Sequence, residues 1–265
     1  MLFQFKMREA AECELQTTEI GKRIPSWFYM TNSEYCIDLG DVKLFELSKE
    51  AVKAEKSSSK FFSWYYASFL EGLFNELPRI VCPVPADLYA YIDTFDKLNS
   101  LTDKLYDLVA CSTEMPVEVR QPIEDNLDKH LIDIGEIITP PQSIVIRMLR
   151  FYDEIVIHHE SYGEVEVGVS YYSATSGEYR LSYQDFVSEV EDLLNRFFAR
   201  MDKQVKDVVA NFTAEEVTQS NIIAEHEERR KYFYEILDNV KQGKYDNLVD
   251  WKKVREDLAY VLERS

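Results

Sequence analysis

The sequence is poor in the residues that shape loops and covalent cross-links. Its 265 residues include only 8 Gly, 8 Pro and 4 Cys. So few glycines argue against a loop-built barrel, and the motifs GxGxxG, GxxxxGK[ST] and GxSxG are absent. The cysteines Cys13, Cys36, Cys82 and Cys111 are widely spaced, and they form neither a CxxC pair nor a zinc pattern. We therefore expect reduced thiols.

Long apolar runs and basic stripes are also missing. No stretch approaches the ~20 apolar residues of a membrane helix, and residues 1–8 lack the apolar core of a signal peptide. The chain has 48 Asp+Glu against 30 Lys+Arg, a formal net charge of −18 that would repel phosphate backbones. The sequence thus predicts a cytoplasmic protein that binds neither membrane nor nucleic acid.

Core-forming residues, in contrast, are plentiful. Hydrophobic residues make up 46% of the chain and aromatic residues 13%, which is enough to build a folded core. A chain of this length fits one large domain or two smaller ones. We expect a single domain over residues 1–265, with a sub-boundary possible near residues 135–142, where Gly135 and Pro140-Pro141 interrupt the pattern.

Two stretches carry strand signals, about residues 1–47 and about residues 143–181. Each consists of short β-branched or aromatic runs separated by turn residues, which is typical of antiparallel meanders. In the first stretch residues 31–33 are expected to form a turn. The strands we expect lie at 2–7, 26–30, 34–39, 42–47, 144–151, 155–159, 165–172 and 179–181.

Two further stretches carry helical periodicity, about residues 60–134 and about 183–263. Pro78 is expected to end the first helix, and Ser182 and Ser220 to cap later ones. The helices we expect lie at 60–77, 86–110, 122–134, from 183 onward, 220–241 and 251–263. Because strands do not alternate singly with helices, the pattern predicts an α+β fold of antiparallel meanders packed with helices.

The acidic residues are unevenly distributed. Residues 87–136 contain 12 acids against 4 bases, and residues 151–179 contain six acids and no base. Such asymmetry creates a field that attracts basic partners, although a solvated face is the commoner explanation of an acidic run. Tyr162, which lies in the second of these segments, is added as a candidate because tyrosine is enriched in interfaces. The candidate partner-binding residues are Asp153, Glu154, Tyr162, Glu164, Glu166, Asp93, Asp96 and Asp103.

His226 is the residue that most invites a catalytic interpretation. Its surroundings, Glu225 to Arg229, lack the second histidine of an HExxH zinc site. Counting by helical turns places it on the face of Phe233 and Leu237, so we expect a buried, hydrogen-bonded histidine. Glu225 and Arg229 should form an i,i+4 pair.

The pair His158-His159 is the other candidate for metal binding. Neighbouring strand residues point to opposite faces, so the two rings cannot easily bind one ion. We expect a strand end at the surface here. No metal, cofactor or catalytic residue is predicted for this chain.

Two segments resemble signatures of an uncharacterised bacterial family of unknown function. They are the run Ser26 to Gly40, which contains a Trp–aromatic–Thr–Asn turn, and the Glu-His-Glu-x-Arg helix at 225–229. Cys36 stands where the family pattern has an aromatic residue. The family implies no activity, but its members resemble immunity proteins of bacterial toxin systems in size and acidity.

Together these features predict an acidic inhibitor that neutralises a cognate toxin by occluding its basic active site. The partner would be a basic protein. Two alternatives stay open: an enzyme of unknown reaction centred on Glu225, His226 and Arg229, and an adaptor module.

Overall fold

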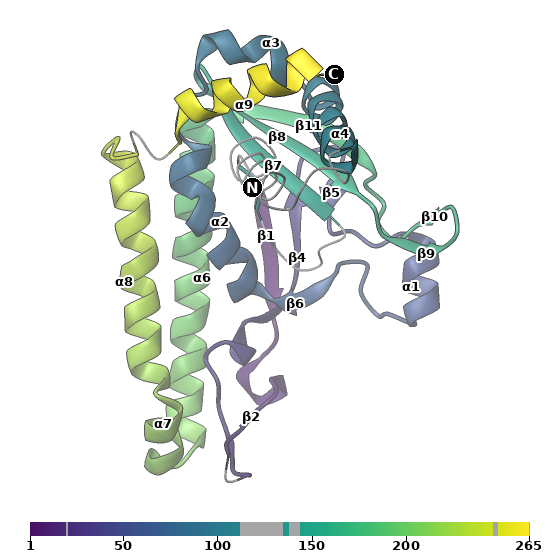
Figure 1. The fold of residues 1–265 in the computed structure, drawn as a ribbon. Helices are drawn as coiled ribbons and strands as arrows, with labels where there is room; N and C mark the ends of the chain where they lie inside the picture. The colour runs from purple at the N-terminus through teal and green to yellow at the C-terminus, as the bar shows by residue number, and fades with distance from the viewer. Residues whose placement is uncertain (20, 112–134, 138–143, 246–248, 265) are drawn as a thin grey trace.

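The computed structural model describes residues 1–19, 21–111, 135–137, 144–245 and 249–264 (Figure 1). Antiparallel sheets and helices share these residues, so the predicted α+β fold is confirmed. The helix predicted at 122–134 lies outside the described residues.

The first sheet has β4 (Asn32–Asp38) at its centre. β1 (Phe3–Met7) pairs with one side of β4, while β5 (Lys43–Leu44) and β6 (Ser63–Tyr65) pair antiparallel with the other. Alternate β4 residues, among them Tyr35 and Ile37, enter the main core, as strand geometry requires. β2 (Gln16–Thr17) and β3 (Arg23–Ile24) form a separate hairpin.

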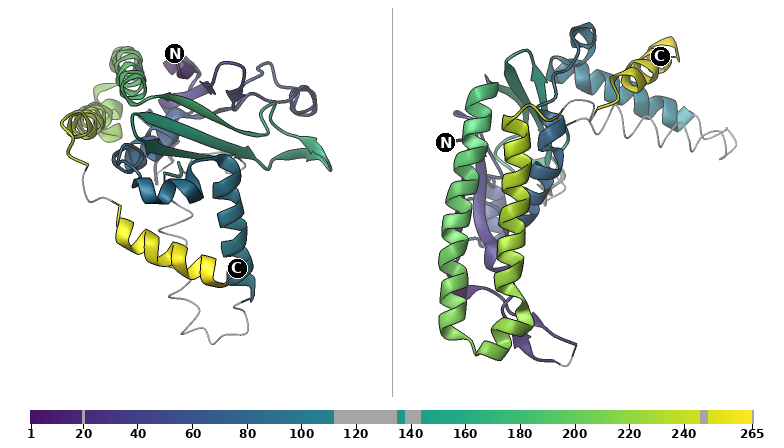
Figure 2. Two further views of the ribbon diagram at one scale, coloured as in Figure 1. Left: turned by 90° about the horizontal axis from the view of Figure 1, so that it is seen from above. Right: turned by 90° about the vertical axis from the view of Figure 1, so that its left-hand side faces the viewer.

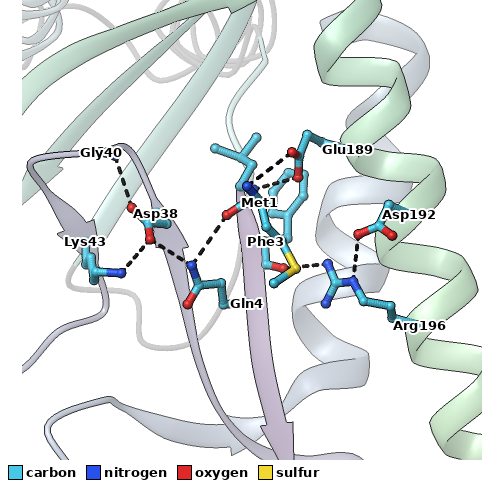
Figure 3. A network of polar contacts seen from close by, with 10 residues as sticks. Met1, Phe3, Gln4, Asp38, Gly40, Lys43, Glu189, Asp192 and Arg196 are labelled. Atoms are coloured by element: carbon cyan, nitrogen blue, oxygen red, sulfur yellow. Dashed lines mark hydrogen bonds and ion pairs between the residues drawn. The ribbon is translucent and has the colours of Figure 1, made fainter.

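Polar contacts fix this sheet to the long helix α6 (Tyr183–Asn211). Arg196 of α6 donates to the carbonyl of Phe3 (2.7 Å), and the amide of Leu2 donates to Glu189 (2.6 Å) (Figure 3). On the other side of β1, Gln4 donates to Asp38 of β4 (2.7 Å), which also pairs with Lys43 at 2.5 Å. The orientation of β1 is therefore set from both of its sides.

The second sheet has the order β11-β8-β7. β7 (Ile144–Phe151) and β8 (Glu154–Ser161) form a hairpin, and β11 (Ser176–Ser182) pairs with the other side of β8. Between β8 and β11 a small hairpin of β9 (Glu164–Glu166) and β10 (Val169–Ser170) extends away from the body (Figures 1 and 2).

Two layers of helices enclose the second sheet. α6 runs beside α8 (Ile222–Lys241), and α7 (Ala214–Ser220) connects them (Figure 2). With α2 (Tyr66–Ile80) these helices bury one sheet face in the main core. The other face contributes Leu149, Phe151 and Val156 to a second cluster with α3 (Tyr89–Ile92), α4 (Phe95–Cys111) and α9 (Trp251–Arg264).

The first predicted helix is wrong at both ends. It begins at Tyr66 because residues 63–65 pair with β4 as β6. It also continues through Pro78 to Ile80, since a proline near the end of a helix removes one hydrogen bond. Leu77 and Ile80 are fully buried, and this burial favours the extra turn.

The predicted helix at 86–110 is divided into three pieces. A 3-10 turn, η3 (Ala86–Leu88), leads into α3, and the chain breaks at residues 93–94 before α4. Thr94 caps α4 by accepting from the amide of Lys97 (3.4 Å), and Glu178 of β11 accepts from the amide of Phe95 (3.2 Å). These side-chain acceptors favour a new helix start over a continuous helix.

Several shorter predictions also need correction. Residues 26–30 are not a strand but a turn entering η2 (Tyr29–Thr31), closed by the Thr31 hydroxyl donating to Phe28 O (2.7 Å), and residues 32–33 belong to β4. The expected strand 165–172 is split at Gly168, whose φ of +78° makes the β9–β10 turn. α8 is preceded by Asn221 in the left-handed region, and Ser220 belongs to α7.

Several short elements were not predicted, among them the β2–β3 hairpin, α1 and η1. α1 (Lys49–Glu55) is capped by Ser48, whose hydroxyl accepts from Ala51 N. η1 (Ala10–Glu12) follows β1. None of the described helices is both long and apolar enough to cross a membrane.

Candidate functional site

The β9–β10 hairpin carries three of the predicted partner-binding residues. Glu164 and Glu166 are exposed on β9, and the ring of Tyr162 precedes them with 61% of its surface exposed. At the turn, Val167 is 99% exposed. In the described part of the chain, neither glutamate forms an ion pair, so the hairpin presents an uncompensated acidic edge beside apolar surface.

Asp153 and Glu154 lie at the other end of β8, in the β7–β8 turn. Glu154 is 3.7 Å from Arg180, and Asp153 is 3.8 Å from Arg150. β8 has 8 residues, which at about 3.3 Å per residue separates the turn from the hairpin by roughly 25 Å. The segment 151–179, which contains no Lys or Arg, thus carries two separate acidic sites. Of the two, only the hairpin lacks a nearby arginine partner.

The predicted acids Asp93, Asp96 and Asp103 are at and after the start of α4, a helix that reaches the hairpin end of β8 through Asn99, which donates to Glu160 (3.3 Å). Arg180 donates to the carbonyl of Asp93 (2.7 Å), which links the start of α4 to β11. The Asp93 carboxylate is already engaged by Lys97 at 2.6 Å. Asp96 and Asp103 are exposed and form no ion pair within the described ranges. The structure therefore does not gather the eight predicted residues into one surface.

Basic side chains do lie close to the hairpin, on α1. Tyr171 beyond β10 donates to Glu55 of α1, and this helix also carries exposed Lys49 and Lys53, with Lys56 at its C-terminal cap. α1 also carries exposed Glu50 besides Glu55, so the surface next to the acidic and apolar edge of β9 has both signs of charge. A partner that fits it must match both signs, which favours one orientation.

The two family-like motifs meet in a buried junction centred on His226. The indole N–H of Trp27 donates to His226 Nδ1 (3.1 Å), and His226 Nε2 lies 2.9 Å from Asp202 Oδ1. Because the indole can only donate, Nδ1 must accept, and the ring proton is on Nε2 facing Asp202. The predicted buried and hydrogen-bonded histidine is confirmed, with 3% of its surface exposed.

Two arginines complete this junction. Arg229 stacks over Trp27 (4.4 Å to the ring centroid) and pairs with Glu225 (2.9 Å), which confirms the predicted i,i+4 pair, and with Glu71. Arg230 donates to the same Asp202 oxygen as His226. Partial burial opposes ionisation of Asp202, but the hydrogen bonds from His226 and Arg230 outweigh it and lower the pKa of the carboxyl.

This arrangement leaves His226 little room for chemistry. Both ring nitrogens have partners, so neither is available to take a proton from a substrate. What the junction does is join the turn after β3 to α6 and α8, across 199 residues of sequence.

The prediction that His158 and His159 lie at an exposed strand end is wrong. Both are on β8 inside the sheet and are buried on opposite faces, because helices cover each face. Neither ring nitrogen of His158 has a hydrogen-bond partner within the described residues. Burial lowers the pKa of His158 to about 4; Arg147, Arg180 and His159 act in the same direction, and Glu178 at 4.0 Å opposes them.

The described residues contain no group of three His, Cys, Asp or Glu side chains placed to hold a metal ion. Cys13, Cys36 and Cys82 are unbridged thiols, and burial raises the pKa of Cys36 to about 11, which keeps it protonated.

The fold places this chain among α+β proteins, with two larger antiparallel sheets and two hairpins in the described residues, and hydrogen bonds through Trp27, His226 and Asp202 join its two distant motifs. The chain belongs to a family of unknown function (DUF5984), whose model matches residues 2–257. Membership in an uncharacterised family was expected from the same two motifs. No curated protein and no solved structure shows significant similarity to this chain.

The exposed Val167 was not among the predicted residues. In sequence it continues an alternating strand, Glu164 to Val169, and only the following Gly168 hints at a turn. The available signal was a valine that directly follows the acids Glu164 and Glu166 and directly precedes a turn glycine.

Proposed function

We propose that this protein is an inhibitor that captures a basic protein partner through the β9–β10 hairpin. The observation that carries the proposal is the unpaired Glu164 and Glu166 beside the almost fully exposed Val167. Exposed charges steer a partner, and an exposed apolar side chain can bury itself in a pocket of that partner. The finer proposal is an immunity protein whose partner is a cognate toxin with a basic active site.

The net charge of the protein supports a basic protein as its partner. At −18, the protein repels anionic polymers and attracts cationic ones over the screening length of about 8–10 Å. A toxin that cleaves nucleic acid must carry a basic groove. An acidic hairpin that enters such a groove would occupy the place of the phosphates.

The enzyme alternative has weaker support. It needs a histidine with an available ring nitrogen, whereas both nitrogens of His226 have partners. A pocket between α3, α4 and α9 lies away from this junction, and no residue of the junction lines it.

The test is affinity capture from cells that naturally contain the protein, with quantitative mass spectrometry. Three baits are compared: the wild type, a Glu164→Lys/Glu166→Lys/Val167→Asp hairpin variant, and a Glu227→Lys/Glu228→Lys/Ile223→Asp variant on exposed positions of α8. The two variants change the net charge equally.

A basic protein retained by the wild type and the α8 variant but lost by the hairpin variant is the expected result. Purified, this protein should lose its activity when mixed with the wild type. Equal retention by all three baits, or enrichment of acidic proteins alone, would contradict the proposal.

A further inference from the structure

The layer formed by α3, α4 and α9 contains a cavity of about 280 Å³. Its lining residues come from α3, from α4 and, through Leu262, from the last turns of α9. It is separate from the acidic hairpin and from the His226 junction, neither of which contributes to its lining.

The cavity walls are mainly apolar. Tyr91 of α3, Leu101 of α4 and Leu262 of α9 contribute to the lining. Tyr91 and Leu262 each leave 39% of their surface exposed. Apolar area that stays in water lowers stability, and an apolar ligand lying between three helices would cover it.

The polar part of the lining comes from one face of α4. Lys97, Ser100 and Lys104 are spaced three, four and seven residues apart, so the three side chains lie on the same helix face. Lys97 is paired with Asp93 at 2.6 Å. Lys104 has no ion-pair partner within the part of the chain that the structure describes.

The placement of these lysines is informative because bases are rare here. Residues 87–136 contain 12 acids and only 4 bases, and two of the bases line this single cavity. The remaining charge in the lining is Asp96. One unpaired cation beside one acid accommodates a single negative charge, whereas a polyanion such as a phosphate ester would be repelled by Asp96.

We propose that this cavity binds a small amphipathic monocarboxylate. Its apolar chain would lie between Tyr91, Leu101 and Leu262, and its carboxylate would be held by Lys104 and the Ser100 hydroxyl. A volume of about 280 Å³ is at the small end of ligand sites, which run from about 300 to 1,000 Å³, so a medium-length chain fits better than a full-length lipid.

The ligand would contact all three helices of the layer at once. α9 is joined to η3 by the Arg255 pair with Asp87 at 2.6 Å. A ligand that covers Leu262 adds contacts at the far end of α9. Bound ligand should therefore raise the thermal midpoint of unfolding, and the stabilisation should grow with the logarithm of the ligand concentration above the Kd.

The experiment titrates the full chain by calorimetry with decanoate, with neutral 1-decanol and with cationic decyltrimethylammonium, each below its micelle concentration. We expect saturable 1:1 binding of decanoate, and Kd values at least tenfold weaker for the two other probes. Lys104→Met should weaken decanoate binding about tenfold and leave 1-decanol unchanged. Leu262→Asp should abolish binding of both.

Lys252→Met is the matched control, because Lys252 lies on α9 with 87% of its side chain exposed and away from the cavity lining. It should leave the decanoate Kd within twofold of the wild type. The proposal is overturned if decanoate does not saturate, if 1-decanol binds as tightly, or if Lys104→Met leaves the decanoate Kd unchanged. The hairpin variant should bind decanoate normally, so this test is independent of partner capture.

Discussion

At the scale of single residues, the molecule places two histidines in opposite situations. His226 is fully hydrogen-bonded between Trp27 and Asp202, whereas His158 is buried with no hydrogen-bond partner within the described residues. The sequence could predict the first because helical counting places His226 on an apolar face. It could not predict the burial of His158, because that depends on Phe95 of α4, which packs against the His158 ring from 63 residues away in sequence.

The indole of Trp27 should contribute to stability through its N–H as well as its volume. In Trp27→Phe the Nδ1 acceptor of His226 is left buried without its donor, and we expect a loss of about 2 kcal/mol or more in the free energy of unfolding. Urea unfolding followed by circular dichroism measures it. Trp64→Phe, at a position 42% exposed, is the control and should cost below about 0.5 kcal/mol.

A second substitution, His226→Phe, separates the contribution of the Trp27–His226 hydrogen bond to stability from that of side-chain packing. If the bond matters, the losses in Trp27→Phe and His226→Phe should be non-additive in the double variant by about 1 kcal/mol. Additive losses would mean that the Trp27–His226 contact acts through volume alone.

His158 should make the protein less stable in mild acid. Its folded pKa of about 4 lies below its ordinary value of 6.5, so the unfolded chain binds the proton first. Stability then falls as the pH decreases from 6.5 towards 4, by roughly 2 kcal/mol at pH 5. His158→Leu should remove this part of the pH dependence while matching the wild type at pH 7.5. If the free energy of unfolding changes equally with pH in the wild type and in His158→Leu between pH 7.5 and 5, His158 is not the source of the acid sensitivity.

At the scale of elements, helix and strand types were largely predictable and their ends were not. β1, α6 and α9 are identified by their periodicities because each has one buried face. β7 and β8 are identified as continuous apolar runs because helices cover both of their faces. The ends of α2 and α4 depend on partners from elsewhere in the chain. β4 pairs with residues 63–65, and Glu178 holds the first amide of α4.

Gly135 marks another connection that local sequence only partly indicates. Met148 N donates to Gly135 O (2.9 Å) and Ile137 N to Ile146 O (2.9 Å), so residues 135–137 extend the pairing of β7. At Gly135, with φ +67°, an added Cβ would lie 2.1 Å from Met148 O. The possible domain boundary at 135–142 stays a prediction.

Gly135→Ala should therefore be far more costly than a typical glycine substitution. We expect a loss of about 3 kcal/mol or more, because backbone strain and a backbone clash combine. Gly40→Ala is the matched control, since its φ is +84° but nothing lies within 4 Å. It should cost about 1 kcal/mol. Equal thermal midpoints for the two variants would mean that β7 moves to accept the methyl group.

At the scale of the whole molecule, the structure shows two features that the composition did not indicate: which acidic residues are neutralised, and which of them project from the body. The sequence located the acid correctly but not its neutralisation, which follows from arginines such as Arg180 that reach across strands. It also could not show that the ends of β8 are far apart. The hairpin was predicted as part of a longer strand, so its projection away from the body appears only in three dimensions (Figure 2).

Association with the captured partner should depend strongly on salt. Raising the ionic strength from about 0.05 to 0.5 M shortens the screening length, so we expect the association rate constant to fall by about tenfold while the dissociation rate changes little. Surface plasmon resonance with the purified partner measures both. A rate constant that is constant over this range would remove the electrostatic part of the proposal.

The most direct test of the proposed function is the association rate constant of that partner for three proteins at fixed ionic strength. They are the wild type, the Glu164→Lys/Glu166→Lys variant and the equally charged Glu227→Lys/Glu228→Lys variant. We predict that reversal on the hairpin slows association about tenfold and reversal on α8 less than threefold. If both reversals slow association equally, net charge alone steers the partner; if neither does, the hairpin is not the binding surface.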